Sequence, residues 1–298
     1  MVGRIGEGII YGLLRLFGRR LEKAEVSWLA GPIGGDHIGD RPYEETAEAE
    51  GLILERQARS GGLLPDFSVL RSSTFDPDRV DPRIRELYEQ TARFSFDTWA
   101  TTYLPARIAL WLLVQTISRR VDQLNFPLDG LDSARGMTSE IVLLRRPDGT
   151  LVYTGWFRRL RNSGRSIYTG FYMTEVIPGQ EGRCVKVVFP MPGGNATVLL
   201  RPENAENGGL RLVSVGSSFG DVGFYRLGQL RDDQLRVWRL DSLHEVFELY
   251  VDEDTVRCDH RIRFLGLPVL ALHYKMSERP SLPGPGSGKH GNVDLRES

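Results

Sequence analysis

Among the residues that could carry acid–base chemistry, His260 has the most informative position. In residues 256–264 apolar side chains alternate with charged ones, and His260 falls on the same side as Val256 and Cys258. An imidazole in an apolar row loses hydration and needs a hydrogen-bond partner. The pattern fits either a core histidine bonded to a neighbouring side chain or a functional group. If the protein catalyses a reaction, we expect His260 to be the acid or base.

A second titratable group would have to converge with His260 in the same cavity. The sequence offers Glu248, Glu175 and Asp221 as carboxylates on nearby predicted strands and loops. We take His260, Asp221 and Glu248 as the candidate catalytic residues, with Glu175 as a further possibility.

Residues 216–220 match the G-x-S-x-G pattern of a nucleophile elbow. That motif requires a strand before it and a helix after it, whereas residues 222–227 continue as a predicted strand. Asp241 and His260 do follow in the order of a hydrolase triad, so a hydrolase remains an alternative to a plain glycine-rich loop. We expect residues 216–223 to border the site, with Ser218 and Asp221 supplying polar groups.

Aromatic residues are concentrated in the second half of the chain, where they occupy both faces of residues 151–160. Aromatic rings with a few polar groups are typical of a cavity for a small molecule, although ordinary core packing uses the same residues. The residues predicted to contact a ligand are Trp156, Tyr172, Ser218, Tyr225 and Trp238.

Several classes of site are disfavoured by composition. The five histidines and two cysteines lack the spacing of metal ligands, so no metal and no cofactor are predicted. A net charge of −1 gives no general attraction to nucleic acid. The arginines within residues 158–165 are interpreted as a solvated hairpin end rather than as an RNA-binding groove.

From residue 139 the spacing of apolar residues changes from about 3.6 residues, which is typical of helices, to about 2 residues, which is typical of strands. The candidate residues after this point are therefore expected to be positioned by strands. Short apolar segments separated by Gly, Pro, Asn and Asp turns predict antiparallel pairing. The expected strands are 140–145, 151–160, 166–176, 184–189, 197–201, 210–215, 222–227, 235–240, 245–251, 256–264 and 269–276.

The predicted fold class is α+β, with a helical N-terminal segment packed on a large, strongly curled antiparallel β domain. The segment spans residues 1–137, the β domain 138–276, and a disordered tail 277–298. Helices are expected over 42–59, from Asp81 through Trp99, and over 106–124. About ten strands form either a barrel or two layers, similar in general style to lipocalins, and this analogy concerns the fold alone.

Residues 1–21 predict an amphipathic helix with Arg15 and Arg19 opposite its apolar side. No signal-peptide pattern follows, and the longest apolar run elsewhere is too short to cross a bilayer. We therefore expect a cytoplasmic protein, with peripheral contact to a membrane or protein partner through this helix as an alternative.

Three functional hypotheses follow from these patterns. The first is binding or modification of a hydrophobic small molecule in a cavity of the β domain. The second is a cofactor-independent isomerase, cyclase or hydrolase that uses an acid–base pair in that cavity. The third is a membrane-surface or partner-binding protein. Whether the protein is an enzyme is left open by the sequence.

Overall fold

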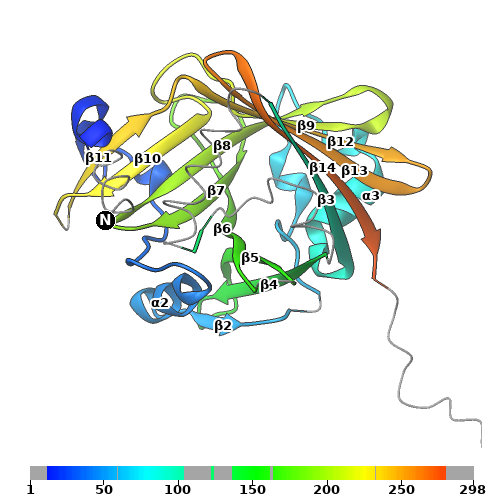
Figure 1. The fold of residues 1–298 in the computed structure, drawn as a ribbon, viewed down its shortest axis with the longest axis horizontal. Helices are drawn as coiled ribbons and strands as arrows, with labels where there is room; N and C mark the ends of the chain where they lie inside the picture. The colour runs from blue at the N-terminus through cyan, green and yellow to red at the C-terminus, as the bar shows by residue number, and fades with distance from the viewer. Residues whose placement is uncertain are drawn as a thin grey trace, which may run out of the picture.

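Antiparallel strands make up most of the protein (Figure 1). The computed structural model describes residues 12–58, 60–103, 122–123, 136–161, 164–231 and 233–279. The strands are β1 (Arg19–Glu22), β2 (Ile53–Glu55), β3 (Phe94–Thr102), β4 (Met137–Arg145), β5 (Leu151–Leu160), β6 (Ser166–Glu175), β7 (Cys184–Met191), β8 (Gly194–Asn204), β9 (Leu210–Val213), β10 (Gly223–Gln229), β11 (Gln234–Arg239), β12 (Leu243–Asp252), β13 (Thr255–Phe264) and β14 (Leu267–Glu278).

The sheet divides into two arms at β8. The first part of β8 pairs with β10, from Gly194 to Leu199, and its last part pairs with β9, from Arg201 to Asn204. The first arm contains β2, β4 to β7, β10, β11 and β1, and the second contains β9, β12, β13, β14 and β3. The two arms face each other across the core (Figure 1).

The sheet is not closed, because no backbone ladder joins β3 to β4 within the described residues. Side chains cross this seam instead. The guanidinium of Arg279 donates to the backbone oxygens of Phe94 and Ser139, at 3.0 and 2.9 Å. The rings of Phe96 and Trp156 lie 4.9 Å apart.

One end of the space between the arms is filled by residues 60–93. Helix α3 (Pro82–Glu89) begins at Asp81, whose side chain accepts a hydrogen bond from the amide of Arg83, as the sequence predicts. Buried side chains of α3 and of the segment before it pack with inward-facing residues of both arms in one core cluster.

Helix α2 (Arg41–Glu50) covers the outer face of the first arm (Figure 1). Its Tyr43 is fully buried against Phe157 and Phe171, at ring-centroid distances of 6.2 and 4.9 Å. The helix ends at Gly51, which takes the left-handed conformation. The helix expected over 42–59 is therefore too long.

Most strands expected from the sequence are present within a few residues of their predicted ends. The turn at residues 147–149 joins β4 to β5, and Gly149 there has a φ of 88°. A mostly antiparallel β protein with few helices is thus confirmed. The sheet is open between β3 and β4 in the described residues, and the barrel-like or two-layer form stays a prediction.

The N-terminal segment contributes more strand than expected. Residues 12–17 are helical, but Arg19–Glu22 forms β1 and pairs with β11. The helix expected to continue to Trp99 ends at Glu89, and Trp99 lies in β3. The expected helix over 106–124 lies almost wholly outside the described residues, as does the expected tail 277–298 beyond Arg279. The predicted start of that tail is too early, because β14 extends through Glu278.

Candidate functional site

His260 lies on the inward face of β13, as the alternation of its strand predicts. Its side chain is 8% exposed and its ring stacks on Phe247, with 3.8 Å between centroids. Its Nε2 lies 3.3 Å from an oxygen of Glu245, and neither ring nitrogen has a hydrogen bond of good geometry within the described residues. A buried imidazole in this state is available to a bound molecule.

Glu245 is the carboxylate that the structure places beside His260, and the sequence reasoning missed it. It shares the inward face of β12 with Phe247 and Leu249, and its side chain is 12% exposed. The backbone oxygen of Glu245 accepts a hydrogen bond from the amide of Ser214 at 3.0 Å, which fixes this end of β12. The same two-residue alternation that selected His260 would have selected Glu245.

Arg158 is a second residue whose environment differs from the expected one. Instead of lying at a solvated hairpin end, it is 4% exposed and points inward from β5. The guanidinium carbon lies 5.0 Å from the Trp156 ring centroid and 5.2 Å from that of Tyr274. Its Nη2 donates to the hydroxyl of Thr98 at 2.9 Å, on the opposite side of the seam. Aromatic faces stabilise a cation in such a position.

Three tyrosines complete this group. The hydroxyl of Tyr168 donates to that of Tyr172 at 2.6 Å. Burial raises the pKa of both, and burial also raises the pKa of Tyr274 to about 12. All three hydroxyls therefore stay protonated and can donate hydrogen bonds near neutral pH.

These residues face one another from the two arms. Tyr274, Arg158 and Glu245 all lie close enough to Tyr172 to influence its pKa. We call Arg158, Tyr168, Tyr172, Glu245, His260 and Tyr274 the polar interior cluster. Its aromatic surroundings, Trp156, Phe189, Phe224 and Phe247, pack against the core and, apart from Trp156, are only partly buried.

The structure separates the other two predicted catalytic carboxylates from His260. Glu248 lies on the outer face of β12, where it binds Arg261 at 2.6 Å. Asp221 accepts hydrogen bonds from the amides of Ser217 and Val222, so its carboxylate stabilises the loop in which it lies. Glu175, the further possibility, pairs with Lys186 at 3.0 Å. Of the eight residues predicted for the site, only Trp156, Tyr172 and His260 come together.

The remaining predicted ligand contacts lie elsewhere. Tyr225 is fully buried beside Trp28 in a separate outer cluster, and its hydroxyl donates to the backbone oxygen of Asp221. Trp238 stacks on Phe17 of the first helix, with 5.6 Å between ring centroids. Ser218 lies in the loop between β9 and β10, and no helix follows it, so the nucleophile-elbow interpretation of residues 216–220 is wrong.

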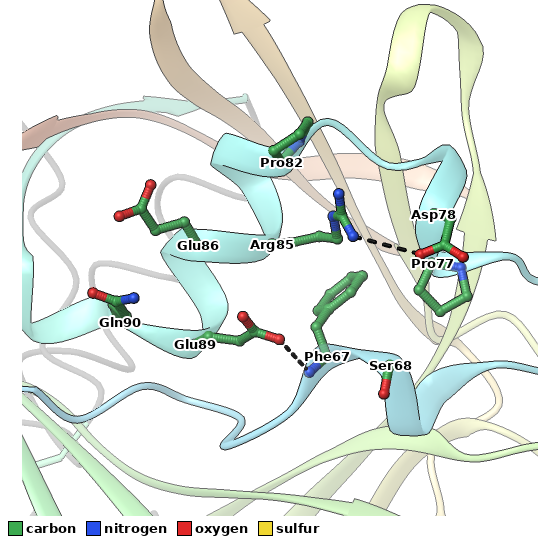
Figure 2. Close-up of a pocket in the computed structure, with 9 residues that line it drawn as sticks. All are labelled: Phe67, Ser68, Pro77, Asp78, Pro82, Arg85, Glu86, Glu89 and Gln90. Carbon is green, nitrogen blue, oxygen red and sulfur yellow. Dashed lines mark hydrogen bonds and ion pairs between the residues drawn. The ribbon is translucent and has the colours of Figure 1, made fainter.

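A surface pocket of about 310 Å³ lies between α3 and the two short turns before it (Figure 2). Its charged groups already have partners within the protein. Glu89 accepts a hydrogen bond from the amide of Phe67 at 2.8 Å, and Arg85 lies 3.5 Å from Asp78 (Figure 2). Because these groups hold the local structure together, we place the candidate site at the polar interior cluster instead.

A metal centre is not supported within the described ranges, where no group of three or more potential ligands converges. Both cysteines are free and buried, Cys184 in the outer cluster with Tyr225 and Cys258 in the core between the arms. Burial raises the pKa of both thiols, to about 12 for Cys184. Neither is a reactive thiolate at neutral pH.

Comparisons with known proteins give one relative. The chain is similar to the "Uncharacterized membrane protein YndJ" of Bacillus subtilis (strain 168), with 25% identity over 288 residues. The similarity covers 90% of this chain and 49% of the relative, so the chain spans about half the relative's length. No protein-family model and no solved structure matches the sequence. In the described part of the chain, none of the helices is both long and apolar enough to span a bilayer.

Proposed function

We propose that the protein binds a hydrophobic small molecule between the two arms of its sheet. The observation that carries this proposal is the polar interior cluster within an aromatic surround. A folded core normally avoids titratable groups unless they are paired, because burial of a charge is costly. A few convergent polar groups on apolar walls are, by contrast, what orients a ligand in a binding site.

Paired substitutions on β12 test this proposal, because Phe247 faces inward and Tyr250 faces outward. Titration of the wild-type chain with decan-1-ol in a calorimeter should show saturable binding with a negative heat-capacity change. Phe247→Ala should weaken binding about tenfold, since it removes apolar contact area. Tyr250→Ala should leave the affinity unchanged. If both variants bind like the wild type, the ligand does not occupy the interior.

A second candidate function is a cofactor-independent isomerase, cyclase or hydrolase. It is favoured by the 3.3 Å separation of His260 Nε2 and Glu245. A carboxylate beside an imidazole can orient the ring and stabilise its protonated form, as a general base requires. We therefore propose His260 with Glu245 as the acid–base pair, in place of His260 with Asp221 or Glu248.

Turnover of a bound molecule would distinguish this candidate from simple binding. His260→Gln and Glu245→Gln should each lower the rate at least a hundredfold if the pair transfers a proton. Glu248→Gln, on the outer face of the same strand, should have no effect on the rate. Product formation can be followed by mass spectrometry on bound ligands. Equal rates in all three variants would exclude acid catalysis by the pair.

A third candidate is peripheral contact with a membrane surface, favoured by exposed apolar residues on the first helix. Leu16 and Phe17 are 74% and 56% exposed, whereas Leu14 is buried. The relative's printed name also refers to a membrane. An exposed apolar helix face of this kind is typical of interfacial contact.

Sedimentation with anionic vesicles tests membrane contact. A deletion up to Ala24 would remove β1, so a double substitution, Leu13→Ser with Leu16→Ser, is the better variant. It should reduce the bound fraction several-fold, while Val176→Ser, another exposed apolar position, should not. Equal sedimentation of all forms would rule out contact through this helix.

A further inference from the structure

Arg158 is a buried cation without a counter-ion among the residues that the structure describes. No carboxylate of the described residues lies within 4.0 Å of its guanidinium, although the side chain is 4% exposed. Among the described residues it donates to the neutral Thr98 hydroxyl at 2.9 Å and to the Met137 sulfur at 3.7 Å, it also interacts with the Tyr274 hydroxyl, and its Nε has no partner. Arginine cannot escape this cost by releasing its proton.

The aromatic rings around Arg158 offset only part of the cost of its burial. Contacts with the faces of Phe96, Trp156 and Tyr274 favour a cation, but they leave the net positive charge in place. Glu245, the nearest inward-facing acid of the cluster, is held beside His260. The interior therefore has a positive charge that a bound anion would neutralise.

Tyr172 supplies a hydrogen-bond donor at the same place. Its oxygen accepts the proton of Tyr168, so its own proton is left to donate, and no acceptor for it occurs among the described residues. The Tyr172 ring lies 5.8 Å from that of Trp156, whose face Arg158 also contacts at 5.0 Å, and Arg158 opposes the rise that burial gives to the pKa of Tyr172. A neutral hydroxyl donor beside a guanidinium is a combination suited to a carboxylate.

We propose that the apolar molecule bound between the arms carries a carboxylate, which Arg158 and Tyr172 bind. This inference rests on the proposed binding function and assigns the chemical class of its ligand: an alkyl or aryl carboxylic acid. The carboxylate lies against Arg158, and the apolar part extends along Trp156, Phe189 and Phe224, which line the same interior. An alcohol of equal length fills the same apolar space but leaves Arg158 without a counter-ion.

A calorimetric comparison of decanoate with decan-1-ol tests this assignment. The wild-type chain should bind decanoate about 10- to 100-fold more tightly, the range expected for hydrogen bonds to charged groups. Arg158→Met should abolish this preference and leave the affinity for decan-1-ol within about twofold, because the apolar walls remain. Tyr172→Phe should reduce the preference about threefold to tenfold.

Arg159→Met is the matched control. Arg159 is the next residue of β5, is exposed, and lies on the outer face over the Phe157 ring at 4.6 Å. Its substitution should leave the preference for decanoate intact. The melting temperature of the Arg158→Met variant should equal or exceed that of the wild type, because the substitution removes an unpaired buried charge.

The outcomes separate the two proposals. If the wild type binds neither molecule, both the binding function and the carboxylate assignment are wrong. If it binds both equally, the interior is an apolar site and only the assignment is wrong. If decanoate is preferred but the preference survives in Arg158→Met, another group binds the anion and the role of Arg158 is refuted. The wild-type comparison requires no variant, so a folding defect in one of them leaves the test decisive.

Discussion

At the scale of single residues, buried charges show where the protein depends on an internal partner. Lys186 has a side-chain exposure of 2%, and its ammonium group lies 3.0 Å from Glu175. Burial lowers the pKa of Lys186, whereas Glu175 opposes that shift. Glu175→Gln should therefore destabilise the protein by roughly 3 kcal/mol in urea unfolding, because it leaves the cation unpaired. Glu203→Gln, which breaks exposed pairs with Arg201 and Arg211, should cost under about 1 kcal/mol.

The same variant has a pH signature with a definite sign. Without Glu175 the folded-state pKa of Lys186 falls further below its value in the unfolded chain. The unfolded chain then binds more protons between these two values, so stability rises with pH. The destabilisation of Glu175→Gln should shrink as the pH rises toward about 10.4, the usual pKa of lysine. A constant difference across this range would show that Lys186 does not titrate there.

The sequence predicts the orientation of a side chain correctly where the pattern of its own strand decides that orientation. Alternation along residues 256–264 was sufficient to place His260 inward, but its partner depends on strand register. Phe247 lies opposite His260 in the ladder, which brings Glu245 of the same face within reach. Glu248 was chosen on residue type alone, and its position one residue beyond Phe247 turns it outward. Arg158 was missed because a charged residue near a turn was taken to be solvated.

At the scale of elements, the docking of α2 on β5 depends on a glycine. A Cβ atom on Gly155 would contact the Tyr43 ring, 2.8 Å from Cδ1 and 3.1 Å from Cζ, and closer still to Cε1. Because Tyr43 is fully buried, the ring cannot move away without displacing the helix. Gly155→Ala should lower the free energy of unfolding by about 1–3 kcal/mol.

Gly35→Ala provides the control for this substitution. Gly35 is exposed, and a Cβ there would meet nothing within 4 Å. The free energy of unfolding of the Gly35→Ala variant should stay within about 0.5 kcal/mol of that of the wild type in the same urea titration. Equal stability of the two variants would show that α2 shifts freely on the sheet.

The helices and strands that the sequence predicts wrongly lie before residue 137. Ile84, Leu87 and Tyr88 have true helical spacing and form α3, but the pattern was extended too far to include Trp99. Phe94 and Phe96 alternate with exposed residues, which is a strand pattern, and β3 pairs with β14 from Phe94 to Thr102. That pairing joins residues far apart in the chain, so local periodicity alone could not reveal it.

At the scale of the whole molecule, strands from the N-terminal third of the sequence complete the sheet. β2 and β3 lie at the two ends of the main strand order, and β1 pairs with β11. A fragment of residues 138–276 would lose all three strands together with α2 and α3. It should aggregate or bind hydrophobic dyes, because three strand edges, those of β11, β4 and β14, and the core beneath α3 become exposed. Cooperative unfolding of a monomeric fragment in calorimetry would contradict this expectation.

The large antiparallel sheet could be predicted from the sequence, whereas its branching could not. Turn residues mark the ends of each strand, but nothing local indicates that β8 has β10 and β9 as successive partners along one edge. The division into residues 1–137 and 138–276 followed a change in period. Backbone pairing crosses this boundary through β2–β4, β14–β3 and β1–β11.

Within the described residues, the seam between β3 and β4 is held by side chains and not by a backbone ladder. Parting these strands breaks no ladder, only side-chain contacts such as those of Arg279 with Phe94 and Ser139. Arg158 also spans the seam through its hydrogen bond to Thr98. If the interior binds a carboxylate as proposed, drawing Arg158 away from Thr98 would loosen the seam as the ligand binds, and one side chain would govern both its entry and its release. The residence time of such a ligand would then depend on exchange of Arg158 between the carboxylate and Thr98, rather than on local unfolding of the sheet.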